Sequence, residues 1–254
     1  MVGIYLSGTG NTKHCIEKLI WFLDSSAECI SLESSNIRQK ITDQDVIVLG
    51  YPTQYSNAPL MVRDFIKSNH EIWKNKKIFI VNTMGLFSGD GTGCTARILK
   101  KYGAKILGGI QIKMPDAVCD SKLLKKSAEE NRQIVKSADC RLEAVATEFK
   151  SGRYPQEGLA FIDHLKGLFG QRLWFYAKTA GYTDKLKISD ECISCGLCVQ
   201  NCPMKNLTMS ANGKPIQKGK CTMCYRCISH CPKQAITLLG KNVVEQTVIE
   251  KFIE

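Results

Sequence analysis

Eight of the thirteen cysteines in this 254-residue chain lie within residues 192–231, in a pattern that occurs twice. The segment Cys192–Met209 matches Cys221–Leu238 at a constant offset of 29 residues, and all four cysteines and the proline that follows them superpose. Each copy reads C-x2-C-x2-C-x3-C-P. Such a repeat predicts one small module built twice. Because the cysteines are so closely spaced, they indicate bound metal held by tight loops.

This spacing is typical of 4Fe–4S ligation, in which the fourth cysteine of each run binds the other cluster. Three cysteines in one loop reach three corners of a cubane, and the fourth corner is reached from elsewhere. A zinc site usually has pairs of C-x2-C separated by a longer gap, and a disulfide scaffold belongs to small secreted chains, so both alternatives are less favoured. The predicted ligand sets are Cys192, Cys195, Cys198 and Cys231 for one cluster, and Cys202, Cys221, Cys224 and Cys227 for the other.

Residues 185–240 resemble the bacterial-type two-cluster ferredoxin, with all eight ligand positions matched. The resemblance implies one-electron transfer at low potential. One departure is electrostatic, because no acidic residue lies between Cys192 and Val244, whereas seven cations do. We expect this charge to stabilise reduced clusters and to attract an acidic redox protein, such as a ferredoxin or a flavoprotein. The alternative is a merely solvated basic surface. The cations are Lys205, Lys214, Lys218, Lys220, Arg226, Lys233 and Lys241.

The first 150 residues alternate short apolar strands with helical stretches. Strands are predicted at 2–7, 28–32, 46–49, 78–82 and 106–114, and helices at 12–23, 59–67, 92–101 and 121–149. Nearly continuous apolar strands that alternate with helices indicate a parallel sheet covered on both faces. The expected fold class is therefore α/β, with a doubly wound five-stranded parallel sheet.

The loop after the first predicted strand favours an anion. Hydroxyls and glycines at a strand's carboxyl end, followed by a helix start, offer unpaired N–H groups to a phosphate. The sequence is neither G-x-G-x-x-G nor a Walker motif, so pyrophosphate and ATP fit it poorly. The loop residues are Ser7, Gly8, Thr9, Gly10, Asn11 and Thr12.

Two further strand ends carry loops, at 51–57 and 82–90, where a ligand would bind at a topological switch point. With these loops, residues 1–150 resemble the flavodoxin-like FMN domain. The resemblance implies that the first loop binds the FMN phosphate and that the other two flank the flavin ring. Tyr55 and Phe87 are the predicted stacking residues, although a loop aromatic side chain equally often covers the core. The implied ring-binding residues are Pro52, Thr53, Tyr55 and Asn57 on one side, and Asn82, Thr83, Gly85 and Phe87 on the other.

The predicted division is a flavodoxin-like domain at 1–151, a helical connector at 152–184 and a small α+β ferredoxin-like domain at 185–254. Gly152 and Pro155 are breakers at the first boundary. Residues 158–178 carry apolar side chains near helical spacing, which predicts an amphipathic helix packed between two domains. A helix that docks on a membrane surface or on a partner is the alternative.

The whole arrangement resembles the flavodoxin–ferredoxin fusion proteins of anaerobic bacteria. It implies a protein that relays electrons between two 4Fe–4S clusters and FMN and serves a separate redox partner. The alternative is an FMN/iron–sulfur oxidoreductase that reduces a small organic substrate at the flavin. An electron carrier is favoured and no catalytic residue is assigned, because the two ring loops hold no His, Cys or acid pair apart from Asp90.

The formal net charge of +11 would suit nucleic acid, but no aromatic-interleaved basic stripe or helix-turn-helix accompanies it. No apolar run approaches the roughly 18 residues that a membrane-spanning helix needs, and the chain starts without a basic leader. We therefore expect a cytoplasmic protein with no transmembrane segment. The five scattered cysteines are expected to be small buried hydrophobic residues: Cys15, Cys29, Cys94, Cys119 and Cys140.

Overall fold

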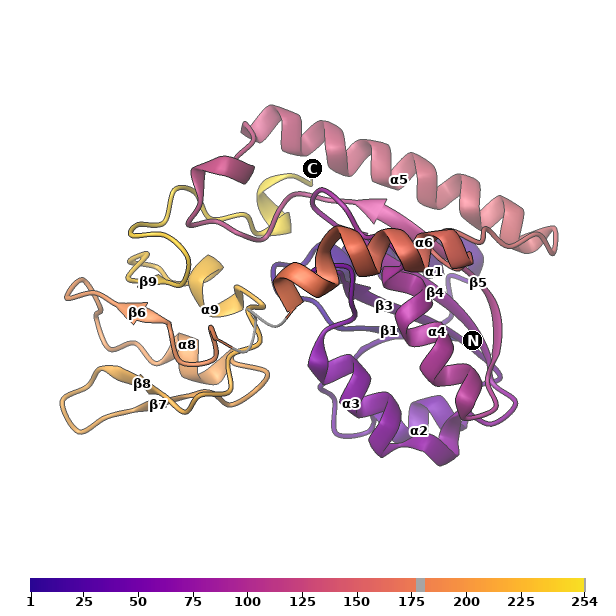
Figure 1. The fold of residues 1–254 in the computed structure, drawn as a ribbon, viewed down its shortest axis with the longest axis horizontal. Coiled ribbons are helices and arrows are strands. Elements are labelled where there is room, and N and C mark those ends of the chain that lie inside the picture. Colours follow the sequence, from indigo (N-terminus) through magenta and orange to yellow (C-terminus); the bar gives the residue numbers. More distant parts are fainter. Residues whose placement is uncertain (177–180, 254) are drawn as a thin grey trace.

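The computed structural model describes residues 1–176 and 181–253 (Figure 1). Its larger part is a five-stranded parallel sheet in the order β2-β1-β3-β4-β5, which confirms the predicted doubly wound fold. The strands are β1 (Val2–Tyr5), β2 (Cys29–Ser31), β3 (Val46–Pro52), β4 (Lys77–Met84) and β5 (Lys105–Lys113). The helices are α1 (Asn11–Leu23), α2 (Ile37–Thr42), α3 (Leu60–Ser68), η1 (His70–Trp73), α4 (Gly91–Lys101), η2 (Lys122–Leu124) and α5 (Ala128–Lys150).

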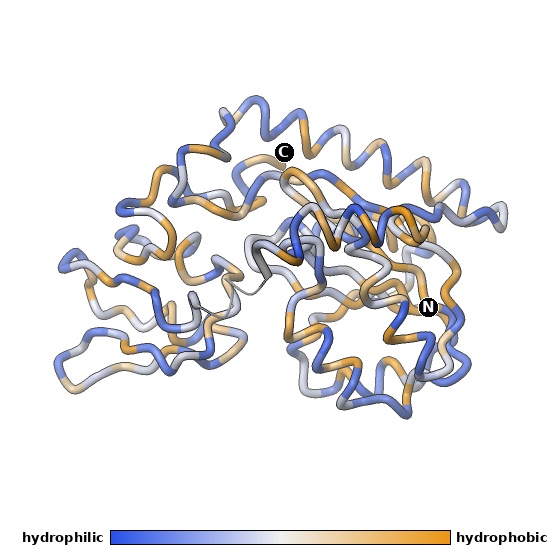
Figure 2. The backbone as a smooth tube through the Cα atoms, viewed as in Figure 1, coloured by the Kyte–Doolittle hydropathy of each residue, from blue (hydrophilic) through white to orange (hydrophobic). Residues whose placement is uncertain are grey.

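The sheet is buried on both faces, as its continuous apolar strands require. One core lies between the sheet and α2, α3 and α4, and the other between the sheet and α1 and α5. Alternate residues of β3 serve the two cores, since Ile47 and Leu49 face the first and Val48 the second. Figure 2 shows hydrophobic residues concentrated in the strands and along the sides of these helices that face the sheet.

The predicted helices differ from the structure in two places. The stretch predicted as one helix at 121–149 is a short 3-10 turn followed by α5, which begins at Ala128. Ser127 and Glu130 form a capping box, in which each side chain accepts a hydrogen bond from the other residue's backbone N–H, so the helix starts there. The six-residue α2 was not predicted.

The connector forms α6 (Phe161–Gly167) and η3 (Leu168–Tyr176), while residues 177–178 of the predicted helix lie outside the described residues. It runs along the larger part of the molecule (Figure 1). The prediction of a buried apolar side was wrong, because its large apolar side chains are mostly in solvent: Phe161, Ile162, Phe169, Leu173 and Trp174 are each 55% to 75% exposed.

Polar contacts hold the connector instead. Asp90, whose side chain is fully buried, accepts from Arg97 at 2.7 Å, and Arg172 and His164 approach its carboxylate oxygens at 2.8 and 2.9 Å. Arg172 and His164 belong to the connector. Asp90 therefore stabilises the connector's position.

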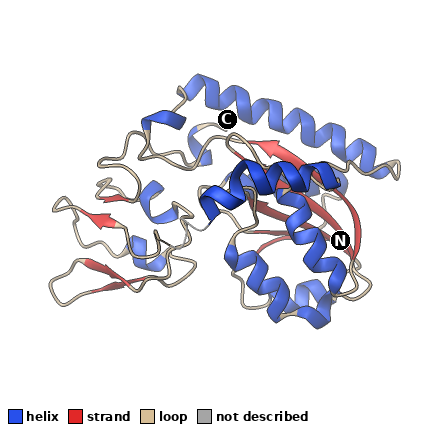
Figure 3. Ribbon diagram, in the orientation of Figure 1, coloured by secondary structure: helices blue, strands red, loops and turns tan. Residues whose placement is uncertain are grey.

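The small C-terminal part contains two antiparallel strand pairs and two short helices (Figure 3). Its elements are β6 (Lys187–Ile188), α8 (Leu197–Gln200), β7 (Leu207–Met209), β8 (Pro215–Gln217), α9 (Arg226–Ser229), β9 (Ile236–Thr237) and η4 (Ile249–Lys251). The chain then returns to the larger part, where Ile249 and Phe252 pack into the core beneath α5.

The internal repeat extends to the backbone. Positive φ angles recur at the 29-residue offset, at Ser194 and Met223, at Gly196 and Tyr225, and at Lys205 and Gln234. The two cysteine loops therefore have the same left-handed turns. Tyr225 adopts at φ 59° the conformation that glycine adopts at position 196, a strained choice for a bulky side chain.

Among the described residues none of the thirteen cysteines forms a disulfide. Cys15, Cys94 and Cys119 are buried as predicted, Cys29 is half-buried, and Cys140 is exposed, contrary to the prediction. No helix in the described part of the chain is long and apolar enough to cross a membrane.

Candidate functional site

A cavity of about 380 Å³ lies at the carboxyl ends of the parallel strands. The three predicted loops line it together, although they are far apart in the sequence. Thr12 Oγ1 and Thr83 Oγ1, 2.8 Å apart, join the first loop to the third. Of the predicted residues, those that line the cavity are Ser7, Gly8, Thr9, Asn11, Thr12, Pro52, Thr53, Tyr55, Thr83, Gly85 and Phe87.

Three predicted residues do not line the cavity. Gly10 is covered by the Ile249 side chain, which lies where a Cβ would be. The Asn57 side chain accepts from the Ala58 N–H within its own turn. Asn82 is fully buried and accepts from Ser88 Oγ. These residues shape the loops from behind the cavity.

The two predicted stacking residues both reach the cavity, from opposite loops. Tyr55 and the following Ser56 have φ angles of 50° and 56°, so the second loop contains two consecutive left-handed residues without glycine. Such strain of about 1–3 kcal/mol per residue tends to cluster at ligand sites. Phe87 is 39% exposed at the cavity's rim.

Sequence reasoning missed the segment after β5, which supplies Met114, Pro115, Asp116, Ala117 and Val118 to the cavity. Asp116 Oδ1 accepts from the Val118 N–H at 2.7 Å, and its other oxygen lies where a side chain at Gly85 would be. Burial raises the pKa of Asp116 above the ordinary aspartate value, against lowering by the Val118 N–H and Lys126. The sequence feature that could have identified Asp116 is its position just after the carboxyl end of the fifth parallel strand.

A further wall of the cavity comes from the second cysteine loop, through Met223, Cys224 and Tyr225, and the cavity is also lined by Ser121, Leu123, Gln171 and Leu239. The approach is close, because a Cβ on Gly8 would lie 2.1 Å from the Cys224 carbonyl oxygen. Gln54 Nε2 donates to the Thr222 carbonyl at 2.7 Å, which fixes the loop from the other side. Tyr225 in turn donates its hydroxyl to Asp120 at 3.0 Å.

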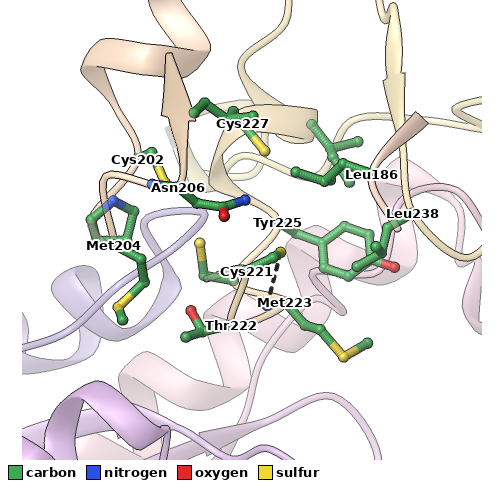
Figure 4. Close-up of a pocket in the computed structure, with 14 residues that line it drawn as sticks. Leu186, Cys202, Met204, Asn206, Cys221, Thr222, Met223, Tyr225, Cys227 and Leu238 are labelled. Carbon is green, nitrogen blue, oxygen red and sulfur yellow. Dashed lines mark hydrogen bonds between the residues drawn. The ribbon is translucent and has the colours of Figure 1, made fainter. Parts of the chain in front are cut away.

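The eight repeated cysteines gather in two small pockets, in the combinations predicted from the sequence. Cys202, Cys221, Cys224 and Cys227 line the pocket nearer the large cavity (Figure 4). The other pocket is lined by Cys192, Cys195, Cys198 and Cys231. In the described part of the chain no three Cys, His, Asp or Glu side chains converge closely enough for a single metal ion.

Comparison with known families identifies both parts. Residues 2–144, more than half of the chain, match the model of the flavodoxin domain. The chain belongs to the flavodoxin family. Residues 185–232 match the model of a 4Fe–4S dicluster domain, so the chain is a fusion of a flavodoxin domain with a 4Fe–4S domain, and its function is in electron transfer.

Solved flavodoxin structures are similar to the flavodoxin domain alone. The two-electron reduced flavodoxin of Megasphaera elsdenii is 25% identical, with a TM-score of 0.42, and the match covers 58% of this chain and 99% of that one. The Fusobacterium nucleatum flavodoxin bound to flavin mononucleotide is 21% identical, with a TM-score of 0.42 over 59% of this chain and 96% of that one. A comparison with curated proteins finds no match.

The flavodoxin domain's cavity fits FMN by its unpaired polar atoms. Ser7 Oγ and Asn11 Oδ1 are buried there without a hydrogen-bond partner among the described residues. Unpaired buried polar groups are costly, so a ligand with acceptor and donor oxygens would satisfy both. A phosphate suits the Ser7 hydroxyl, and a sugar-like hydroxyl suits the Asn11 carbonyl oxygen. FMN carries both groups.

One arginine joins the flavodoxin domain to the second cysteine loop. Arg226, between Cys224 and Cys227 in sequence, donates to the Ser7 carbonyl at 2.7 Å and to the Asn201 carbonyl at 3.1 Å. Both of its terminal nitrogens also bind Glu33, at 2.8 and 2.5 Å. The guanidinium thus contacts the phosphate loop, the first cysteine repeat and the flavodoxin surface together.

Burial also governs the thiols of this loop. It raises the pKa of Cys224 to about 11, although the Arg226 N–H and the positive charge of Arg226 oppose the shift. A thiol with such a pKa is protonated at neutral pH. A bound metal would stabilise the thiolate, which is the form that a cluster requires.

Proposed function

We propose that this chain relays electrons between two 4Fe–4S clusters and one FMN, and serves a separate redox protein. The observation that carries the proposal is the shared wall of the flavin-sized cavity. Cys224, a ligand assigned to the second cluster, lines the same cavity as the phosphate loop and both ring loops. The three-part division of the chain predicted from the sequence, at 1–151, 152–184 and 185–254, is part of the proposal.

The ligand assignment gives the two clusters different positions. The set with Cys202, Cys221, Cys224 and Cys227 would hold the proximal cluster, beside the flavin cavity. The set with Cys192, Cys195, Cys198 and Cys231 would hold the distal cluster, and none of its pocket comes from the flavodoxin domain. When bound, the clusters and the flavin would supply one-electron chemistry. The protein's residues would fix the order in space of distal cluster, proximal cluster and flavin.

The distal site offers the surface for a partner. Cys195 is exposed there, beside Ile193 at 56% and Leu197 at 39% exposure. Lys233 lines the same pocket, and no acidic residue occurs from Cys192 to Val244. Exposed apolar side chains at a redox site beside Lys233 support docking of an acidic one-electron carrier, such as a ferredoxin or a flavoprotein, although Asp190 and Glu191 precede Cys192 and Asp190 pairs with Lys214.

A reductase of a small organic substrate is the second candidate, and Asp116 is the observation that favours it. A half-buried carboxyl at the cavity wall with a raised pKa has the properties of a proton donor. The distinction is whether the flavin passes its electrons to a substrate in the cavity or back to protein partners.

The test begins with anaerobically purified full-length protein. We expect about eight irons and one FMN per chain, from two four-iron clusters and one cavity. Photoreduction of the flavin should be followed by electron transfer to the clusters at a first-order rate that does not depend on protein concentration, because the relay is intramolecular. A rate proportional to concentration would refute the relay, and turnover of an organic substrate faster than oxidation by an acidic ferredoxin would favour the reductase.

A further inference from the structure

The pocket of the proximal cluster contains one polar side chain with an unused donor. Asn206 is fully buried and lines this pocket with the four cysteines. Its Nδ2 has no hydrogen-bond partner among the described residues. Figure 4 shows the Asn206 amide on the cysteine-lined side of the pocket, between Cys202 and Cys227. A buried N–H group without an acceptor indicates that a missing group accepts from it.

The orientation of this amide follows from its other contacts. Asn206 Oδ1 accepts hydrogen bonds from the backbone N–H of Lys220 at 2.6 Å and of Lys218 at 3.2 Å. The opposite orientation would place the amide NH2 against two N–H donors. The oxygen therefore faces the 218–220 segment, and Nδ2 faces the cysteines.

The internal repeat shows that the two cluster pockets differ in side-chain donors at this position. The residue 29 positions later, beside the distal set, is Ala235, which has no donor in its side chain. At this pair of positions the backbone contributions match, since Asn206 N–H donates to Cys202 Sγ at 3.2 Å and Ala235 N–H donates to Cys231 Sγ at 3.3 Å. The proximal set has one further backbone donor, the Met223 N–H, at 3.5 Å from Cys221 Sγ. The side-chain amide is thus an additional donor for the proximal pocket.

We propose that Asn206 Nδ2 donates a hydrogen bond to a sulfur of the proximal cluster and thereby makes it the easier of the two clusters to reduce. The inference rests on the proposed function, because it needs the clusters that the cysteines would hold. An N–H donor stabilises the more negative, reduced state of an iron–sulfur centre more than the oxidised state. The step adds one electron to the cluster, moves no proton and breaks no bond.

As a consequence, an electron shared between the two clusters would favour the proximal one. An electron that enters at the exposed distal site would reside mainly on the proximal cluster, next to the flavin cavity. Arg226 adds positive charge on the same side, although Glu33 neutralises much of it. Asn206 therefore acts as a positioning residue, which influences which cluster holds the electron, and not as a catalytic residue.

The test is a redox titration of each cluster, followed by electron paramagnetic resonance, in the FMN-loaded full-length protein. Asn206→Ala copies the distal repeat, and Asn206→Asp keeps the acceptor for the 218–220 segment while it removes the donor. We expect either change to lower the proximal potential and to shift the electron-sharing ratio roughly tenfold, which corresponds to about 59 mV for a one-electron couple. Asn242→Ala, at an exposed position of the same domain, is the matched control and should change neither potential.

A second measurement does not depend on a variant that folds. In wild-type protein labelled with asparagine that carries 15N only at the side-chain amide, pulsed paramagnetic resonance of the reduced proximal cluster should detect coupling to Asn206 Nδ2. Absence of that coupling, or unchanged proximal potentials in both Asn206 variants, would overturn the inference while leaving the relay intact. Wild-type protein that lacks the clusters would overturn the proposed function and this inference together.

Discussion

The ion pair of Arg226 with Glu33 should stabilise the contact between the cysteine loop and the flavodoxin domain. The two side chains are only 18% and 24% exposed, and the pair is bidentate. Exposed pairs contribute about 0.2–1 kcal/mol, whereas close charge pairs in interfaces couple by about 1.5–7 kcal/mol. For this intermediate burial we expect a coupling energy of about 2 kcal/mol, which is roughly a 30-fold change in an equilibrium constant.

The assay is a double-mutant cycle with Glu33→Gln and Arg226→Gln, read by hydrogen exchange of the loaded protein. Amides of the phosphate loop and of residues 221–229 should exchange roughly 30-fold faster in either single variant, because local opening becomes easier. Glu33 contacts no cysteine, so its variant separates docking from loss of a cluster. The Arg38–Glu71 pair, with side chains 59% and 50% exposed, provides the matched cycle. A coupling energy for Glu33–Arg226 no larger than for this exposed pair would refute the reasoning.

Three further changes have defined outcomes. Gly8→Ala should push the Cys224 carbonyl away, since a Cβ would lie 2.1 Å from that oxygen, and should weaken FMN binding at least tenfold by fluorescence titration; unchanged affinity would contradict the close contact. Burial holds the pKa of Asp116 above its unfolded value, so the free energy of unfolding should fall as pH rises from the ordinary aspartate range through the raised pKa. Asp116→Asn should abolish that fall in urea titrations, and an identical slope in both proteins would count against it. Asp120→Ala should lower the free energy of unfolding by about 3 kcal/mol, because the N–H groups of residues 238–240 lose their buried acceptor; a loss below about 1 kcal/mol would show that water replaces it.

The local parts of this molecule were readable from the sequence. Continuous apolar runs predicted the five strands, and the cysteine spacing predicted both ligand combinations that the structure gathers into pockets. β3 and β4 run further than predicted, because pairing of Pro52 with Thr83 extends the ladder into polar residues. The start of α5 was also readable, since Ser127 and Glu130 form a recognisable capping box that the prediction overlooked.

The contacts between distant segments were not readable. Nothing local to Asp116 distinguishes a cavity wall from a solvated turn, and Tyr225 occupies a position where the first repeat has glycine. The prediction for the connector was wrong for a related reason. The periodicity of a sequence shows how apolar side chains are spaced, but it does not show which part of the molecule packs on them. The connector is attached to the larger part through the ion pair of Asp90 with Arg172. These residues are 82 positions apart, and no sequence pattern predicts that they pair.

The cysteine loop that closes the flavin cavity imposes an order on the maturation of the protein. A nascent flavodoxin domain lacks one wall of its cavity until residues 223–225 have been synthesised and folded around iron. If the second cysteine set binds a cluster as proposed, retention of the flavin would then depend on iron supply. Cells that make this protein under iron limitation should therefore accumulate a colourless chain, without either cofactor.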